Sequence, residues 1–370
     1  MVGRLSSPDL SITLNGLHLK NPLILAASGL TYDQTGMISF IKRGFSGVVT
    51  KSITWNPCAG TSTKASTSFS TNSPRAFGEN GLWMTGSESA YNPGYKKACE
   101  AIKIAKKVAD EHDAHIIAQV QANSVEQWGQ MAAGFEQAGA SAIELNMVCP
   151  PTIMAKLGIP GFENLGLIWS KDVEKTCAAI KAAKHAVDVP VWPKMHGTNL
   201  HDPEKLKRYE DAGTDAFTVS GHYGLFNFPA MFIDVETGKQ IGTPPRESAL
   251  GPLIWPFSVW RISQIARLSK KPLIGSGGIM NGKQVIEAFM VGSDAVQICT
   301  GAWWEPTIAE RILKEIREFM GKKGYSKLEE VKRIALKLLP RSEQAAQEEI
   351  RQAYERDGYM QEEPSLHNIR

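Results

Sequence analysis

The sequence predicts an α/β protein, a (β/α)8 TIM barrel with a β-hairpin before it and a helical extension after it. Three observations predict this fold. From residue 21 onward, short apolar runs alternate with helical patterns, which is typical of βα units in a parallel sheet. Eight such runs can be counted. A single barrel of this kind uses about 250 to over 400 residues, so the length of 370 residues requires no second domain.

The eight candidate strands are short and rich in apolar residues, as expected for strands that are buried on both faces. They are residues 23–27, 47–50, 115–119, 142–145, 191–194, 216–220, 273–276 and 295–298. A weak internal repeat supports the count, because RGFSGV, AGASAI, AGTDAF and VGSDAV each place a glycine between a helical pattern and a strand, where a left-handed residue is favoured. Such turns also occur in an open doubly wound sheet, but the number of strands favours a closed barrel.

The segments on either side of the barrel have signals of their own. Residues 10–20, LSITLNGLHLK, alternate around Asn15 and Gly16, a pair that favours a β-hairpin because both positions tolerate positive φ. After residue 321 the chain is rich in Lys, Glu and Arg at helical spacing. We therefore predict a barrel with its hairpin over residues 1–321 and a helical extension over 322–370, which serves packing or subunit contact.

Composition argues against several classes of protein. The chain has 41 basic and 38 acidic residues, a formal charge of +3, which gives no support for binding nucleic acid or a membrane surface. No stretch approaches the ~20 apolar residues that span a bilayer, and the N-terminus has no apolar signal region. We expect a cytoplasmic protein.

The cysteines are odd in number and contain no C-x-x-C pair. They are Cys58, Cys99, Cys149, Cys177 and Cys299. This spacing argues against a disulfide framework and against a zinc or iron–sulfur site supplied by this chain, and it fits a reducing compartment.

Three connections are too long to be simple turns: residues 52–92, 149–170 and 221–256. Each follows a candidate strand, so each should lie at the C-terminal end of the barrel, where active sites of this fold are built. We expect these three loops to form the substrate site.

Glycine-rich segments follow the last two candidate strands, IGSGGI at residues 274–279 and ICTGA at 298–302. Loops at these places in the fold commonly bind a phosphate group, because glycines let backbone N–H groups approach it and a helix N-terminus adds a favourable dipole. We predict phosphate contacts at Gly277, Gly278, Cys299 and Thr300. The alternative is that the two glycines only make a tight turn.

Chemically active side chains stand at other strand ends. Lys51 and Lys194 each end a candidate strand, and a buried ammonium is costly unless it meets an anion. With phosphate loops at the same end, the two lysines favour a bound anionic cofactor over solvated rim positions. In ELNMVCPPT, Asn146 ends the fourth strand and Cys149 begins a long loop. A loop thiol can act as a general acid or base, whereas a lone cysteine is otherwise a small buried apolar residue.

As a set, these motifs resemble the dihydroorotate dehydrogenase family. The matching segments, in order, are NPLILAASG at 21–29, GVVTKS at 47–52, ELNMVCP at 144–150, PVWPKM at 190–195, GPLIWPFSVWRI at 251–262, PLIGSGGI at 272–279 and AVQICTGA at 295–302. The similarity covers roughly residues 10–305. The NSPR stretch at Asn72 and the cysteine in QICT are most similar to the barrel domain of dihydropyrimidine dehydrogenase.

The resemblance implies that the cofactor is FMN. The residues that it implies as FMN contacts are Ala27, Ser28, Lys51, Ser52, Asn146, Lys194, Gly251, Gly277, Gly278, Cys299 and Thr300. Lys194 would lie near flavin N1 and the C2 oxygen, where its charge stabilises the anionic reduced ring. Family members are commonly dimers, so the resemblance also implies a homo-oligomer.

The resemblance further implies the catalytic residues. Cys149 falls on the position where a cysteine or serine moves a proton while hydride passes between a substrate carbon and flavin N5, with Lys51 and Lys194 beside it. A cysteine at this position is similar to the soluble members of the family, because the membrane-associated, quinone-linked members use serine.

The substrate positions depart from the pattern of the family. Where the family has amide side chains for a pyrimidine ring, this chain has Met84 or Gly86, then Pro151, then Gly221 and His222. A site that pairs amides loses affinity heavily when the partners vanish, so dihydroorotate and uracil are doubtful substrates.

The side chains that replace these amides are more aromatic and suit a flatter or larger ligand. They are Trp83, Met84, His222, Tyr223 and Phe226. Glu88 and His222 are the polar groups that remain to orient the substrate. The alternative role of the aromatic residues is packing over the flavin.

The sequence thus favours an FMN-dependent oxidoreductase that acts on a C–C bond next to a carbonyl in a cyclic substrate. A second hypothesis is a genuine dihydroorotate or dihydropyrimidine dehydrogenase whose amide contacts come from other residues. A third is a flavin-binding subunit that exchanges electrons through a partner with FAD or iron–sulfur centres. A fourth is a barrel that binds only a sugar phosphate.

Overall fold

The structure is a computed structural model. It describes residues 7–58, 84–86, 91–149, 158, 160–161, 163–220, 229–230, 232–233, 235–241, 247–340, 345, 347–348 and 350–352.

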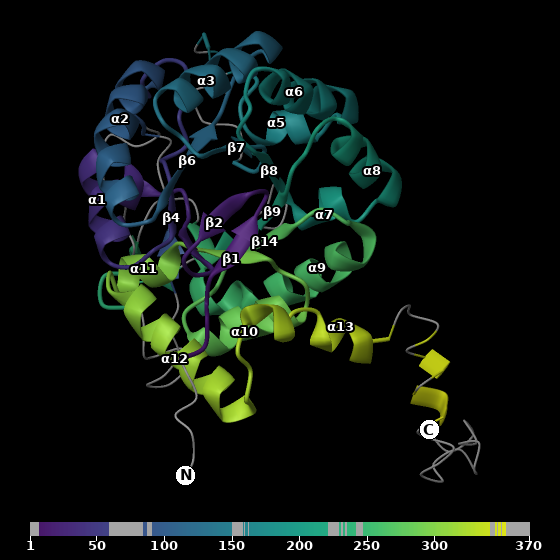
Figure 1. Ribbon diagram of the computed structural model, residues 1–370. Helices are drawn as coiled ribbons and strands as arrows, with labels where there is room; N and C mark the ends of the chain where they lie inside the picture. Colours follow the sequence, from purple (N-terminus) through teal and green to yellow (C-terminus); the bar gives the residue numbers. More distant parts are fainter. Residues whose placement is uncertain are drawn as a thin grey trace.

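Eight parallel strands close into a barrel, with helices in a ring around it (Figure 1). The strands are β3 (Leu23–Leu25), β4 (Gly47–Val49), β6 (His115–Val120), β7 (Ala142–Asn146), β8 (Val191–His196), β9 (Phe217–Ser220), β14 (Leu273–Ser276) and β15 (Ala295–Ile298). They follow one another around the barrel in chain order, and β15 pairs with β3 to close it. The predicted (β/α)8 fold is confirmed.

Among the described residues, eight longer helices form the outer ring, and five of them begin at a residue whose side chain caps the first turn. The eight helices are α1 (Gln34–Lys42), α2 (Tyr95–Glu111), α3 (Val125–Gln137), α6 (Val173–His185), α8 (Pro203–Asp211), α9 (Trp255–Leu268), α10 (Gly282–Met290) and α12 (Ile308–Lys323). At α1, α3 and α10, the side chains of Asp33, Ser124 and Asn281 accept hydrogen bonds from the first turn, which satisfies N–H groups that have no partner within the helix. Each helix buries one apolar face against the barrel.

The predicted hairpin consists of β1 (Ile12–Leu14) and β2 (Leu17–Leu19), joined by Asn15 at φ 50° and Gly16 at φ 83°. Asn15 Oδ1 accepts a hydrogen bond from Trp192 Nε1 at 2.9 Å, and Asn15 Nδ2 donates to the carbonyl of Asp215 at 2.9 Å. Trp192 lies near the start of β8 and Asp215 just before β9. The hairpin therefore covers the N-terminal end of the barrel, and in Figure 1 it lies over the centre of the ring.

Replacing Asn15 with alanine is expected to lower the free energy of unfolding by about 2 to 3 kcal/mol, because it removes both hydrogen bonds and leaves alanine at positive φ. The control is Asn15→Gly, which removes the same two hydrogen bonds without the backbone strain, because glycine tolerates positive φ. Urea unfolding measures both variants. A midpoint for Asn15→Ala equal to that of the wild type would show that the hairpin turn contributes nothing to stability.

The first part of the C-terminal extension packs against the barrel. After α12 come the short helices η3 (Leu328–Glu330) and α13 (Ile334–Leu338). Leu328 and Val331 are buried in the core, and the N–H of Arg333 donates to the carbonyl of Phe289 at 2.9 Å. These helices are shorter than the spacing of SKLEEVKRIALKLLP suggested, because Arg333 at φ 61° separates them. The division of the chain at residue 321 stays a prediction.

Two small sheets were not predicted. β5 (Met84–Gly86) and β10 (Pro229–Ala230) both pair with β13 (Glu247–Leu250), and β11 (Phe232–Ile233) pairs with β12 (Gln240–Ile241). The first sheet joins the long connection after β4 to the long connection after β9. Two of the three loops that we assigned to the substrate site are therefore physically linked.

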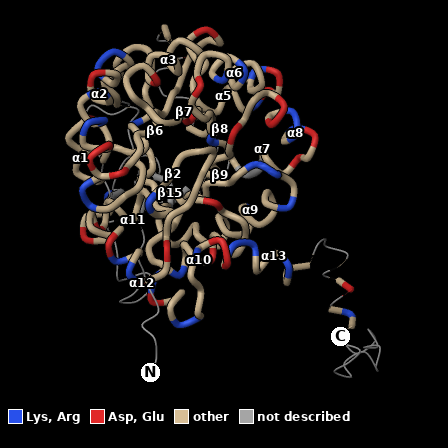
Figure 2. The backbone as a smooth tube through the Cα atoms, viewed as in Figure 1, with Lys and Arg blue, Asp and Glu red and all other residues tan. Residues whose placement is uncertain are grey.

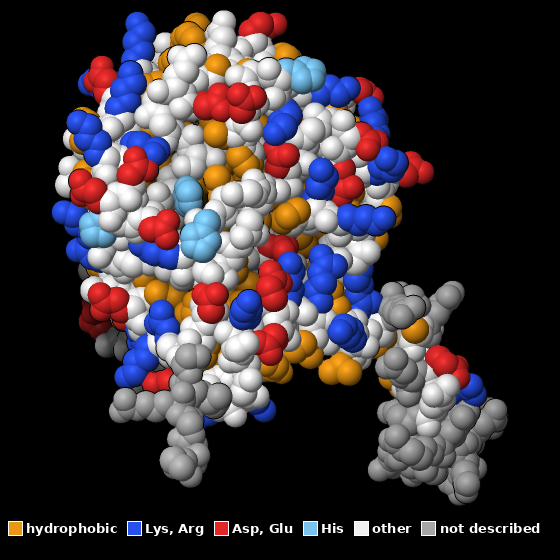
Figure 3. All heavy atoms as spheres, in the orientation of Figure 1, with side chains coloured by type: hydrophobic (Ala, Val, Ile, Leu, Met, Phe, Trp, Pro, Cys, Tyr) orange, Lys and Arg blue, Asp and Glu red, His pale blue; other side chains and the backbone are white. Residues whose placement is uncertain are grey.

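Charges of both signs are interspersed along the outer helices (Figure 2). On the face that carries the hairpin, basic and acidic side chains are mixed and neither forms one continuous patch (Figure 3). Within the ranges that the structure describes, no helix is both long and apolar enough to cross a membrane.

Candidate active site

The predicted catalytic and cofactor residues gather at one end of the barrel. Ala27 and Ser28 follow β3, Lys51 and Ser52 follow β4, Asn146 and Cys149 end and follow β7, Gly277 and Gly278 follow β14, and Cys299 and Thr300 follow β15. Because the strands are parallel, their C-terminal ends meet at the same end, opposite the hairpin. The residues predicted from separate motifs are thus brought together by the barrel.

Cys149 is held by the amide of Asn146. Asn146 Nδ2 lies 3.0 Å from Cys149 Sγ and donates to it, and it also donates to Ser52 Oγ. Asn146 Oδ1 accepts from the N–H groups of Val148 and Cys149 at 3.0 and 3.1 Å. One side chain therefore shapes the turn after β7 and orients the half-buried thiol.

Two further residues hold the backbone at Cys149, and neither was predicted from the sequence. The ring of buried His196 lies 3.1 Å from the carbonyl of Val148. Gly166 has φ +59°, and a Cβ there would lie 2.2 Å from the carbonyl oxygen of Cys149. The N–H of Leu167 donates to that same oxygen at 2.8 Å. Neither His196 nor Gly166 belongs to a motif, so only their long-range contacts reveal their role.

The two lysines lie in different surroundings. Lys51 is 7% exposed, and its N–H donates to the carbonyl of Thr31 at 3.0 Å. Lys194 does not end its strand as predicted, because β8 continues to His196 by pairing with β9. The Lys194 side chain therefore extends into the barrel, where Nζ donates to Gln297 Oε1 at 2.9 Å and lies 3.5 Å from Glu144 Oε1.

Glu144 is a fully buried carboxylate that the sequence analysis did not single out. Its Oε1 accepts from Gln119 Nε2 and lies near Lys194. Its Oε2 accepts from Thr218 Oγ1 at 2.8 Å and from Gln297 Nε2. A charged residue between the apolar Ile143 and Leu145 of this buried strand was the available signal, since a buried charge is retained only with partners.

The glycine turn after β14 requires glycine. Gly277 and Gly278 have φ 109° and 88°, and Gly251 on the neighbouring connection has φ 79°. A Cβ on Gly278 would lie 2.7 Å from the N atom of Trp255 and 2.9 Å from the carbonyl oxygen of Gly251. Gly278 thus lets two connections approach each other closely. A simple tight turn, the alternative considered from the sequence, would not require this close approach.

Several backbone donors at this turn are available. Among the hydrogen bonds between described residues, the N–H groups of Gly277, Gly278 and Thr300 donate none. Thr300 is the first residue of α11 (Thr300–Trp304), with Cys299 at its N-cap. Because the N–H groups of glycine turns and helix starts commonly bind anions, these three are suited to an anionic ligand.

The residues predicted at the β3 end have smaller roles in the structure. Ser28 is buried, and its Oγ accepts from the N–H of Leu30 at 3.2 Å. Ala27 is partly buried against the core. Their contact with a cofactor stays a prediction.

Most of the predicted substrate contacts fall outside the described residues. These are Trp83, Glu88, His222, Tyr223 and Phe226. Met84 lies in β5, and its backbone pairs with that of Leu250, the residue directly before Gly251. The structure therefore places a predicted substrate segment beside a predicted cofactor segment.

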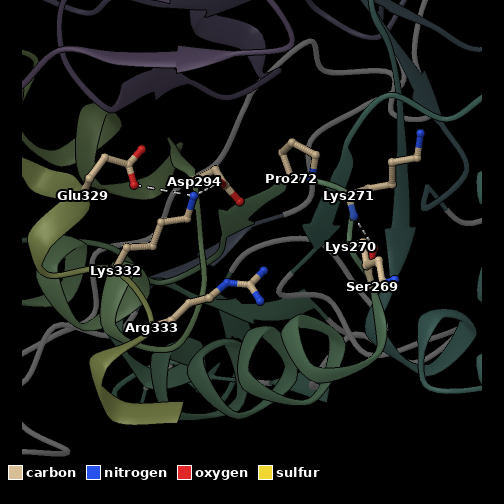
Figure 4. A pocket seen from close by; sticks show the side chains of 8 residues that line it. All are labelled: Ser269, Lys270, Lys271, Pro272, Asp294, Glu329, Lys332 and Arg333. Atoms are coloured by element: carbon tan, nitrogen blue, oxygen red, sulfur yellow. Dashed lines mark hydrogen bonds and ion pairs between the residues drawn. The ribbon is translucent and has the colours of Figure 1, made fainter. Parts of the chain in front are cut away.

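A separate hollow of about 590 Å³ lies at the opposite end of the barrel (Figure 4). It is lined by Pro272 before β14, Asp294 before β15 and residues of the C-terminal extension. Lys332 pairs with Asp294 and lies 3.7 Å from Glu329. The ammonium of Lys271 points away from Asp294 in Figure 4. This hollow lies between the C-terminal extension and the barrel, at the end opposite the predicted catalytic residues.

Comparison with known proteins agrees with this arrangement. A family model described as dihydroorotate dehydrogenase matches residues 9–320. A Bacillus pumilus relative, "Dihydroorotate dehydrogenase B (NAD(+)), catalytic subunit", is 28% identical over 87% of this chain and 94% of its own length. Relatives with the same name from Thermoplasma volcanium and Methanothermobacter thermautotrophicus are each 29% identical, over 89% and 88% of this chain and 99% and 98% of their own. Because the family model spans most of the chain, this protein belongs to the dihydroorotate dehydrogenase family.

Proposed function

We propose that this protein is an FMN-dependent oxidoreductase that acts on a C–C bond next to a carbonyl in a cyclic substrate, with Cys149 as the acid or base. The observation that carries the proposal is the meeting of three features at one end of the barrel. They are an oriented thiol, a lysine in the barrel mouth and a glycine turn with available N–H donors.

The donor set at this end fits FMN. The N–H groups of Gly277, Gly278 and Thr300 are suited to the phosphate, as glycine turns and helix starts are in many phosphate sites. Lys51 and Lys194 supply positive charge, and Asn146 supplies an amide. The remaining predicted contacts, Ala27, Ser28, Ser52, Gly251 and Cys299, would complete the site.

In this proposal the residues divide the work of the reaction. When bound, FMN supplies the hydride chemistry. Cys149 gives a proton to the substrate or takes one from it at Sγ. The amide of Asn146 donates to that sulfur at 3.0 Å, so it stabilises the negative charge that remains on sulfur when the proton is on the substrate. The positive charges of Lys194 and Lys51 would stabilise negative charge on the cofactor.

The natural substrate follows from two opposing observations. The relatives are named dihydroorotate dehydrogenases, which makes dihydroorotate the first compound to test. The chain has Pro151, Gly221 and His222 where the family pattern has amides, which favours a ring with fewer amide groups. We propose that the substrate is a ring with fewer amide groups. Its contacts would be Met84, Glu88, His222 and Tyr223.

We also propose a partner subunit that carries FAD or iron–sulfur centres. The matched relatives are named as catalytic subunits of an NAD(+) enzyme, and the five cysteines of this chain form no C-x-x-C pair. Cytoplasmic location and a homo-oligomer are part of the same proposal. Direct and rapid reduction of the isolated chain by NADH or NADPH would argue against a separate electron-transfer subunit.

The visible spectrum of the purified protein tests the cofactor and the substrate class together. With ample riboflavin during expression, we expect the bands of a bound oxidised flavin. Anaerobic addition of dihydroorotate, dihydrouracil and non-pyrimidine cyclic carbonyl compounds should bleach these bands only with the matching substrate. A folded protein that has no flavin bands and takes up no added FMN would contradict the proposal and favour the sugar-phosphate alternative.

A further inference from the structure

A polar layer crosses the interior of the barrel just below the candidate site. Its centre is the carboxylate of Glu144, and the donors come from four other strands: Gln119 on β6, Lys194 on β8, Thr218 on β9 and Gln297 on β15. In this fold the interior is normally filled by bulky apolar side chains in layers. Packing alone therefore does not explain a carboxylate with 0% exposure in this layer.

Lys194 is the partner that gives this layer its electrostatic character. Within the part of the chain that the structure describes, it is the one cation within ion-pair distance of Glu144, with Nζ 3.5 Å from Oε1. Gln119, Thr218 and Gln297 are neutral donors. Gln297 also accepts from Lys194 Nζ at 2.9 Å, so one glutamine connects the cation to the far oxygen of the carboxylate.

Glu144 and Lys194 differ in the exposure of their side chains. The Glu144 side chain is 0% exposed and the Lys194 side chain is 12% exposed, so the ammonium is the more accessible member of the pair. Three hydrogen bonds hold the carboxylate in place, and the carboxylate together with Gln297 fixes the ammonium. A fixed carboxylate behind a cation reduces the net positive potential that a ligand in front of that cation experiences.

We infer that Glu144 is a positioning residue and counter-ion that acts through Lys194, and that it sets the reduction potential of the bound cofactor. This inference rests on the proposed function. Removal of the carboxylate charge leaves the ammonium uncompensated, which favours the reduced, anionic form of the cofactor over the oxidised form.

Glu144→Gln tests the inference, because it removes the charge and keeps the shape. We expect the ratio of the affinities for reduced and oxidised FMN to rise about tenfold, which for a two-electron couple raises the midpoint potential by about 30 mV. Spectroscopic titration of the holoenzyme against dyes of known potential measures it. The matched control is Thr218→Val, which removes a neutral donor from the same carboxylate and should lower stability without moving the potential.

A second pair of variants tests whether Glu144 acts on the cofactor through Lys194. Lys194→Met should lower the potential, and the double variant Glu144→Gln/Lys194→Met should equal Lys194→Met, because Glu144 acts on the cofactor only through Lys194. If Glu144→Gln does not fold, Glu144→Asp keeps the charge but draws it back from Lys194 by one methylene. It should shift the potential in the same direction by a smaller amount.

The outcomes separate this inference from the proposed function. A wild-type protein that binds no FMN overturns the proposed function. If the wild type binds FMN, an unchanged potential in the folded Glu144→Gln or Glu144→Asp holoenzyme overturns the inference alone. It is also overturned if Thr218→Val shifts the potential as much, or if the shift persists at full size without Lys194.

Discussion

Replacement of Cys149 by alanine is expected to slow the reduction of bound flavin by substrate by roughly 100- to 10,000-fold, the usual contribution of a positioned acid or base. The thiol lies half-buried three residues after β7, oriented by Asn146 at 3.0 Å, and the variant removes the proposed proton carrier. Anaerobic stopped-flow measurement of the reductive half-reaction gives the rate directly, while the flavin spectrum before mixing reports whether FMN is still bound.

The matched control for this variant is Cys99→Ala. Cys99 lies in α2, away from the strand ends, with Sγ 3.8 Å from the carbonyl of Gly134, and burial raises the pKa of its thiol. It removes a thiol of the same size without a predicted effect on rate. A Cys149→Ala enzyme that binds FMN and reduces it at the wild-type rate would exclude Cys149 as the acid or base.

Replacement of Gly278 by alanine is expected to weaken both the fold and the binding of FMN. At φ +88° an alanine is strained, and its Cβ would lie 2.7 Å from the N atom of Trp255 and 2.9 Å from the carbonyl of Gly251. Strain at such a position costs about 1 to 3 kcal/mol, and displaced backbone atoms add to it. The turn must move, so the N–H donors move with it, and the affinity for FMN should fall roughly 10- to 100-fold. Thermal unfolding and FMN titration of the apoprotein measure the two effects.

Gly324→Ala separates crowding from backbone strain. Gly324 caps α12 at φ +75°, and a Cβ there would have no atom within 4 Å. This variant should lose about 1 kcal/mol of stability and bind FMN like the wild type. Equal losses of stability and unchanged FMN affinity in both variants would mean that the turn at Gly278 neither crowds its neighbours nor holds the cofactor.

The barrel strands were predictable because a strand that is buried on both faces is a short apolar run whatever its partners are. β14 and β15 have the bounds that the pattern predicted. The end of β8 was not predictable, since the strand continues through Met195 and His196 by pairing with Val219 and Ser220 of β9. A strand ends where its neighbour stops pairing, and a single segment carries no information about its neighbour.

The candidate site divides in the same way. The residues Asn146 and Cys149 stand three positions apart and belong to one turn, so their partnership was readable from the motif. The contact between Glu144 and Gln297 joins residues 153 positions apart, and the glycine at 166 is explained by its positive φ and by the close approach of the carbonyl of Cys149. Packing across the barrel selects these residues, and no local pattern marks them.

The sequence by itself determined the alternation of strands and helices, the hairpin turn at Asn15 and Gly16, and the placement of Lys51, Cys149 and the glycine motifs after strand ends. These are consequences of backbone preferences and of the burial of apolar residues over a few positions. Only the tertiary structure decided how charge is compensated inside the barrel, because the donors that neutralise Glu144 come from four different strands. Electrostatic compensation depends on distance in space, and closure of the barrel is what brings these side chains within reach of one another.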